Sequence, residues 1–191
     1  MIARLAYLLI ATLWALPASA ADLELTELMT LLAGVPSATN SFIESKQSAL
    51  LSAPLVLKGR LVYGRPDHLE KHVLSPYDEN TVIARGAVSI ENRTLKQKKS
   101  FALSASTSAA ALVEGMRATL AGDAPALERY YSIRLEGSRD AWLLTLTPRD
   151  EKLAGMVARI RIAGARERLR RIEVDEGSGD QSVMLIGPAT P

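Results

Sequence analysis

The feature that most constrains the fold is a succession of short segments in which apolar and polar residues alternate. The first follows Pro36, where Phe42, Glu44 and Lys46 fall on one face of a period-two pattern. Turn residues separate it from further segments at 56–63, 69–74, 81–84, 87–91, 95–103, 131–135, 141–147, 157–163, 169–174 and 182–186. The strand–helix–strand alternation of a parallel sheet is missing. The sequence therefore predicts an antiparallel sheet of roughly ten strands.

Helical patterns occur only before the first strand and in the middle of the chain. Asp22 can cap a first helix that ends at Gly34, and Ser108 can cap a second that ends at Gly122. Asp123 can cap a short third piece with Pro125 in its first turn. Because an antiparallel sheet has edges that must be covered or closed, we expect a strongly curved sheet with helices over its open side. This is a mainly β fold with helices, in one domain at 21–191.

The amino-terminal segment resembles a secretory signal peptide. Arg4 precedes an apolar run from Leu5 to Leu16, and the small residues Ala18-Ser19-Ala20 follow Pro17. The run is shorter than the roughly 20 residues of a spanning helix, which makes a retained anchor the weaker reading. We expect cleavage near Ala20 and Ala21. The chain has no cysteine to carry a lipid anchor, so we expect an exported protein free in the periplasm.

The composition argues against a nucleic-acid partner. The chain has 23 lysines and arginines against 21 acidic residues, and only 5% of its residues are aromatic. A nucleic-acid-binding face would combine a basic surface with interleaved aromatic residues. The basic run at Lys96–Lys99 is better explained as a solvated turn or an edge strand.

Catalytic and metal motifs are weak. His68 and His72 are the only histidines, and in a strand they share a face with Glu70 but lie about 13 Å apart at ~3.4 Å per residue. One metal ion cannot bridge that distance, so we expect an exposed strand face there. No serine lies in a nucleophile elbow and there is no thiol nucleophile. We expect neither an enzyme nor a bound cofactor or metal.

Several short motifs resemble the periplasmic outer-membrane lipoprotein carrier, LolA, and its relatives. In the first half, the strand that opens with Phe42 is followed by the stretch from Gly59 to Pro66, which carries the pair Arg65-Pro66. Pro76 follows at the family's spacing, and Arg85-Gly86 stands where the family has Asp-Gly. The second half is similar to a divergent subfamily through Leu120-Ala121-Gly122-Asp123, Leu127, Tyr130, and the strand from Trp142 to Pro148.

The resemblance implies an unclosed β-barrel, covered by a helical lid, that encloses an apolar cavity for acyl chains. It implies a carrier that takes lipoproteins or another lipid from an inner-membrane donor complex to an outer-membrane acceptor. We expect it to act as a monomer. Arg65 matches the family arginine that holds the lid, and its guanidinium can donate to several helix-end carbonyls at once.

The predicted cavity wall comes from one face of successive strands. On one strand this face carries Leu69, Lys71 and Val73. The other expected lining residues are Leu61, Tyr63, Trp142, Leu144, Leu146, Ile160 and Ile162, with Leu112 and Met116 from the lid. The same alternation also builds a filled β core, so the pattern alone leaves both possibilities open.

Two departures from the family bear on the cargo. The strand after Arg85-Gly86 has no aromatic residue, and Lys71 stands where the family often has one. A bare charge is costly to bury. Either the stem of Lys71 lines the wall while its ammonium reaches the rim, or the ammonium meets an acidic head group. Either arrangement argues against the standard lipoprotein cargo. Members of the divergent subfamily that the chain resembles often accompany the biosynthesis of lipid-like pigments, so the resemblance implies a non-protein lipid as a candidate beside lipoproteins.

Two other classes of function remain open at this stage. A periplasmic sensor or protein-interaction module would use the same fold with a filled or shallow cleft and no lipid. A lipid-ester hydrolase would need a nucleophile beside a base, and His68 and His72 are the only histidines that could serve. We rank the carrier first and the hydrolase last.

Overall fold

The structure is a computed structural model that describes residues 23–105 and 107–189. The expected signal peptide lies outside the described residues. The helices of the described part are α1 (Leu25–Ala33), the short 3-10 helix η1 (Leu103–Ala105), α2 (Thr107–Ala121), α3 (Ala124–Tyr130) and α4 (Glu151–Ala154). None of these helices has both the length and the hydropathy needed to span a membrane.

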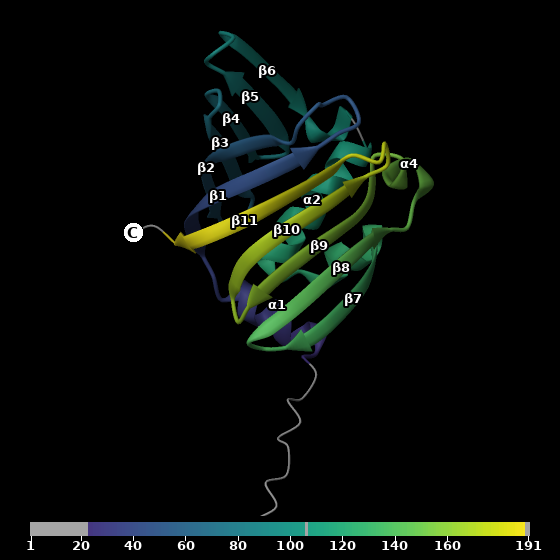
Figure 1. Cartoon of the computed structure of the whole chain (residues 1–191). Coiled ribbons are helices and arrows are strands. Elements are labelled where there is room, and N and C mark those ends of the chain that lie inside the picture. Colours follow the sequence, from purple (N-terminus) through teal and green to yellow (C-terminus); the bar gives the residue numbers. More distant parts are fainter. Residues whose placement is uncertain (1–22, 106, 190–191) are drawn as a thin grey trace, which may run out of the picture.

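The strands form one antiparallel sheet. In the first half of the chain they are β1 (Ser37–Gln47), β2 (Leu55–Gly64), β3 (His68–Ser75), β4 (Glu79–Ala84), β5 (Ala87–Asn92) and β6 (Gln97–Ala102). In the second half they are β7 (Tyr131–Ser138), β8 (Ala141–Pro148), β9 (Val157–Ala165), β10 (Arg168–Glu176) and β11 (Gln181–Ala189). Their order is β6-β5-β4-β3-β2-β1-β11-β10-β9-β8-β7. β6 and β7 are the two edge strands and do not pair with each other, so the sheet is curved but not closed (Figure 1).

The period-two pattern corresponds to the two faces of this sheet. Phe42 on β1 is paired with Gly59 on β2 and with Ile186 on β11, so these positions share the inner, concave face. A Cβ atom at Gly59 would lie 1.9 Å from the His72 carbonyl oxygen. Glycine is therefore needed where β2 and β3 approach each other closely.

The helices pack over the inner face through a fully buried tyrosine. Tyr131, at the start of β7, has no exposed surface, and its hydroxyl donates to the Ala111 carbonyl at 3.2 Å. A Cβ atom at Gly115 would come within 2.7 Å of the Tyr131 ring. Gly115 thus lets α2 lie against this ring, although glycine lowers helix propensity by about 1 kcal/mol relative to alanine.

Several predicted boundaries are confirmed. The Asp123 side chain accepts from the Ala126 backbone N–H and caps α3. Gly122 ends α2 with a φ of 70°, and Arg85-Gly86 forms the β4–β5 turn with φ values of 51° and 71°. The basic run Lys96–Lys99 forms the turn into the edge strand β6 and its first half.

Other boundaries were wrong. Helix α2 begins at Thr107, so Ser108 lies inside it; the run of small polar residues there offers several equivalent starts. Helix α1 begins after Glu24, and the proposed cap Asp22 lies outside the described residues. The turn expected at 136–140 is shorter, because β7 continues to Ser138. Helix α4 was missed, although Asp150 caps it by accepting from two backbone N–H groups.

Candidate functional site

The helices cover only one half of the inner face. They contact mainly one another and the β7 to β9 part of the sheet, α3 meeting β7 and α4 meeting β8 and β9. In Figure 1 the strands β4 to β6 project beyond them. The inner residues of the covered half form a packed core in which Leu144, Leu146, Ile160 and Ile162 have no exposed surface, and Trp142 is only 2% exposed.

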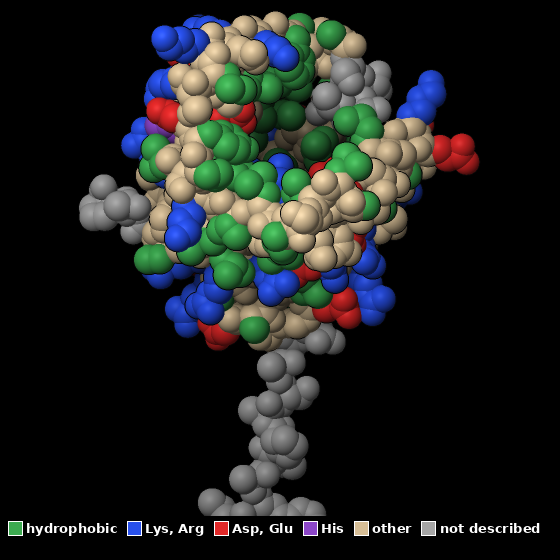
Figure 2. All heavy atoms as spheres, turned by 45° about the horizontal axis from the view of Figure 1, so that its top comes forward, with side chains coloured by type: hydrophobic (Ala, Val, Ile, Leu, Met, Phe, Trp, Pro, Cys, Tyr) green, Lys and Arg blue, Asp and Glu red, His purple; other side chains and the backbone are tan. Residues whose placement is uncertain are grey.

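The other half of the inner face is less filled. One row of paired residues crosses it through Leu61, Lys71, Thr81 and Ile90, and every one of these residues is partly exposed. Figure 2, turned by 45° from Figure 1 so that the top comes forward, shows a hollow edged largely by hydrophobic side chains, with Lys or Arg and acidic side chains also visible in it. We call this region, the inner face of β2 to β5, the open half.

The open half is apolar at one end and polar at the other. The row at the carboxyl end of β2 is apolar and carries Tyr63, Leu69, Ile83 and Val88. At the opposite end the corresponding row carries Gly59, Val73, Glu79 and Asn92. Lys71 lies in the row between them. The open half therefore has the polarity gradient that an amphiphilic ligand would match.

Lys71 faces inward and forms an ion pair with Glu44. Its ammonium donates to the Glu44 carboxylate and lies 5.4 Å from the centre of the Phe42 ring. The Glu44 side chain is only 4% exposed, whereas the Lys71 side chain is 29% exposed. Burial lowers the pKa of Lys71, and the Glu44 charge opposes that shift. The pair therefore hides its anion and presents its cation to the hollow.

Glu44 was not predicted from sequence as a partner of Lys71. The ion pair leaves the Lys71 side chain 29% exposed, so it is compatible with either arrangement expected from sequence, an ammonium at the rim or one that meets a head group. Glu44 was the missed residue. The sequence contained a signal for it: Glu44 lies two residues after Phe42 and so shares the inner face, where a carboxylate needs a cationic partner. Lys46, two residues further, places its ammonium 4.0 Å from the same carboxylate.

Arg65 lies beyond the apolar end of the open half. It follows β2, its side chain is exposed, and its guanidinium donates to the Ala121 carbonyl at 3.1 Å. Ala121 is the last residue of α2, where the helix carbonyls lack partners and a cation is favoured. A single hydrogen bond therefore joins the end of β2 to the end of α2.

The remaining predicted lining residues divide between the two halves. Tyr63 is buried in the open half, and Leu61 and Leu69 are partly exposed there. Val73, on the inner face of β3, belongs to the main core. The Tyr63 hydroxyl has no hydrogen-bond partner among the described residues. From α2, Leu112 and Met116 are partly buried against the main core. The structure thus divides the predicted wall between the open half and the packed core.

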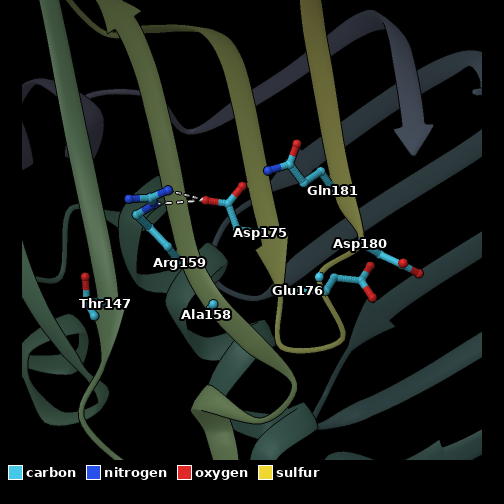
Figure 3. Close-up of a pocket in the computed structure, with 8 residues that line it drawn as sticks. Thr147, Ala158, Arg159, Asp175, Glu176, Asp180 and Gln181 are labelled. Atoms are coloured by element: carbon cyan, nitrogen blue, oxygen red, sulfur yellow. Dashed lines mark hydrogen bonds and ion pairs between the residues drawn. The ribbon is translucent and has the colours of Figure 1, made fainter. Parts of the chain in front are cut away.

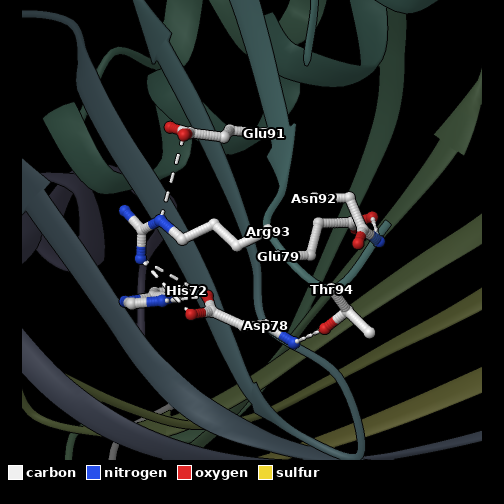
Figure 4. Close-up of polar contacts among 7 residues, drawn as sticks. All are labelled: His72, Asp78, Glu79, Glu91, Asn92, Arg93 and Thr94. Carbon is white, nitrogen blue, oxygen red and sulfur yellow. Dashed lines mark hydrogen bonds and ion pairs between the residues drawn. The ribbon is translucent and has the colours of Figure 1, made fainter. Parts of the chain in front are cut away.

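The histidine strand differs from the exposed face expected from sequence. His72 is only 7% exposed, because the β3–β4 turn brings Asp78 over it, with His72 Nε2 2.8 Å from Asp78 Oδ1 (Figure 4). This contact and Arg93 hold the pKa of Asp78 below its usual value. His68 lies 3.6 Å from Glu70 instead. The described residues contain no group of three side chains suited to a metal ion.

A second depression lies on the outer face. Its lining includes Arg159 on β9 and Asp175 on β10, which form an ion pair at 2.6 Å, and residues of the β10–β11 turn (Figure 3). Asp175 also lies 3.6 Å from Arg161, which in turn pairs with Glu173. These four charges pair with one another, and the other charged residues of the lining, Glu176 and Asp180, are both acidic.

The comparisons with known proteins give the family. The model of the outer membrane lipoprotein carrier protein LolA-like family matches residues 16–191. The chain therefore belongs to this LolA-like family, as the sequence motifs indicated. Comparison with curated proteins gives no match.

Two solved structures are similar over most of the chain. A LolA superfamily protein from Nitrosomonas europaea is 11% identical, with a TM-score of 0.47, over 88% of this chain and 93% of that one. A DUF1329 family protein from Desulfovibrio piger is 12% identical, with a TM-score of 0.48, over 86% and 89%. Because both identities are low, the family assignment rests on the match to the family model and not on these structures.

Proposed function

We propose that this protein is an exported carrier that shields acyl chains, or another lipid-like group, from water in the open half. The observation that carries the proposal is the inner face of β2 to β5, where apolar side chains that include Leu69, Ile83 and Ile90 remain partly exposed. Membership of the LolA-like family supports it. We place the carrier in the periplasm, carrying cargo towards the outer membrane from an inner-membrane donor to an outer-membrane acceptor.

The proposed mechanism is burial without chemistry. Each CH₂ group removed from water contributes about 0.8 kcal/mol, so a chain of a dozen carbons could gain roughly 10 kcal/mol before the costs of binding. The apolar row with Leu69, Ile83 and Val88 would receive the chain. Release requires the grip to weaken, and the hydrogen bond from exposed Arg65 to α2 is a contact that can break and re-form.

Mass spectrometry of bound lipid tests this proposal. The mature protein is purified from periplasm without detergent and its organic extract is analysed. We expect a lipid or lipopeptide in stoichiometric amount. Leu69→Gln, on the inner face of β3, should reduce that amount severalfold, because it places an amide in the path of the chain. Leu74→Gln is the matched control, since Leu74 on the same strand is 58% exposed.

The absence of bound lipid would argue for a different function. A clean extract, together with no uptake of added acyl chains, would contradict the carrier. It would favour a protein-interaction module instead. An equal loss of lipid from Leu69→Gln and Leu74→Gln would show that lipid binding does not depend on the open half.

A further inference from the structure

The charges of the open half indicate the chemistry of the ligand's head group. Two cations, Lys71 and Lys46, surround the Glu44 carboxylate, and their side chains are 29% and 43% exposed against 4% for Glu44. The two ammonium groups are therefore more accessible to a ligand than the carboxylate that they contact. Glu44 keeps Lys71 in place rather than offering itself to a ligand.

Lys71 retains hydrogen-bonding capacity in this arrangement. An ammonium group has three N–H donors, and the contact to Glu44 uses one of them. The neighbouring residue on β4, Thr81, adds a hydroxyl on the same face. Unused donors on a partly desolvated cation favour an ionised acceptor, because charge-assisted hydrogen bonds are stronger and shorter than neutral ones.

The charged group of the polar row, Glu79, already has a partner. Glu79 accepts a hydrogen bond from the Asn92 side chain at 3.0 Å. Glu79 and Glu44 both raise the pKa of Tyr77 nearby, after burial. The negative charge of Glu79 therefore repels an anionic ligand, and the charged group of such a ligand is expected beside Lys71 and Lys46.

We propose that Lys71, positioned by Glu44 and assisted by Lys46, binds the anionic head group of a lipid whose chain extends along the apolar row towards Tyr63. The inference rests on the proposed carrier function and names the class of its cargo: a single-chain or multi-chain lipid with a carboxylate or phosphate, rather than an uncharged one. Lys71 lies in the row between the apolar row and the polar row. It therefore lies where the chain and the head group of such a lipid would meet.

The test compares probes that share a chain and differ in the head group. Binding of dodecanoate, dodecyl phosphate and dodecanol to the mature protein is measured by calorimetry at pH 7. We expect the better of the two anions to bind about tenfold to a hundredfold more tightly than the alcohol, the range that one charge-assisted hydrogen bond supports. Whichever anion binds better identifies the head group as a carboxylate or a phosphate.

Variants assign this preference to Lys71. Lys71→Met should abolish the preference for anions and leave dodecanol binding within about twofold, because the methionine keeps the apolar stem. Lys58→Met on the outer face of β2 is the matched control, and should keep the preference. If Lys71→Met fails to fold because Glu44 is left unpaired, the double variant Glu44→Gln, Lys71→Met removes both charges and gives the same test.

The outcomes separate the two proposals. Equal binding of the alcohol and both anions by the unchanged protein, or a preference that survives the loss of Lys71, would overturn the head-group inference while leaving the carrier in place. Failure of all three probes to bind would overturn the carrier and this inference together.

Discussion

At the residue scale, the interior contains two kinds of polar side chain with different roles. Tyr131 is enclosed by the helices and has its hydroxyl satisfied by Ala111. Lys71 is paired but still reaches the hollow. A buried and satisfied polar group stabilises the fold, whereas a partly exposed cation on an apolar face is available to a ligand. The structure thus separates residues that hold the core from those that can recognise cargo.

The pKa of Tyr131 makes a prediction about alkaline stability. Burial raises this pKa from 10.0 to about 12. The folded state therefore favours the neutral phenol, and its contribution is fully present below pH 10 and lost as the pH rises towards 12. The size of the shift corresponds to about 3 kcal/mol. We expect the free energy of unfolding to fall by about this amount across that window.

Denaturant unfolding at a series of pH values checks this loss. Tyr131→Phe should be less stable at neutral pH, since it loses the bond to Ala111, but should lose much less stability between pH 10 and pH 12. The neighbouring Tyr130→Phe should behave like the unchanged protein. Burial also lowers the pKa of Lys71 and raises the pKa of Tyr77, and the contributions of these two groups are common to all three proteins. An equal alkaline loss in Tyr131→Phe would refute the assignment to Tyr131.

At the scale of elements, α2 connects the packed core to the open half. Its middle lies against Tyr131 through Gly115, and its carboxyl end accepts the hydrogen bond from Arg65 after β2. The first contact is buried and the second is exposed. The hydrogen bond from Arg65 can therefore open at low cost, while the close contacts at Gly115 and, towards α1, at Gly122 remain in place.

Replacement of Arg65 tests the proposed latch. Arg65→Leu should leave the global free energy of unfolding within about 1 kcal/mol, because one exposed hydrogen bond is lost. It should speed amide hydrogen exchange around Ala121, since local opening becomes easier. Arg60→Leu, an exposed arginine on the outer face of the same strand, should change neither. We also expect Arg65→Leu to impair cargo transfer or release. Unchanged exchange, or normal transfer, would remove the latch.

The sequence predicts the secondary-structure elements better than it predicts the contacts within the candidate site. Alternation and turn residues are local, so the strands and the shared face of Leu69, Lys71 and Val73 could be predicted. The partner of Lys71 could not, because Glu44 lies 27 residues away and two strands across. The burial of His72 was missed for the same reason, since Asp78 reaches it only through the β3–β4 turn. Such contacts depend on the curvature and register of the sheet, which local patterns do not encode.

At the scale of the whole molecule, the curved sheet serves two purposes. The helices fill the concave side over β7 to β9, where Leu144, Leu146, Ile160 and Ile162 are fully buried. The remaining concave side, over β2 to β5, keeps partly exposed apolar residues. Periodicity placed the expected lining residues of both halves on one face of the sheet but left open whether that face lines a cavity or fills a core. Which half the helices cover is set by packing between elements distant in sequence.

The central claim is that lipid chains bind in the open half and not in the packed core. A fatty acid with a photoreactive diazirine near the end of its chain tests it most directly: the probe is bound, irradiated, and its attachment sites are mapped by peptide mass spectrometry. We predict attachment to β2, β3, β4 and β5, concentrated around Leu69, Ile83 and Val88, and competition by unlabelled fatty acid. Attachment confined to β8 and β9 or to the outer face, or labelling that competitor does not reduce, would contradict the account.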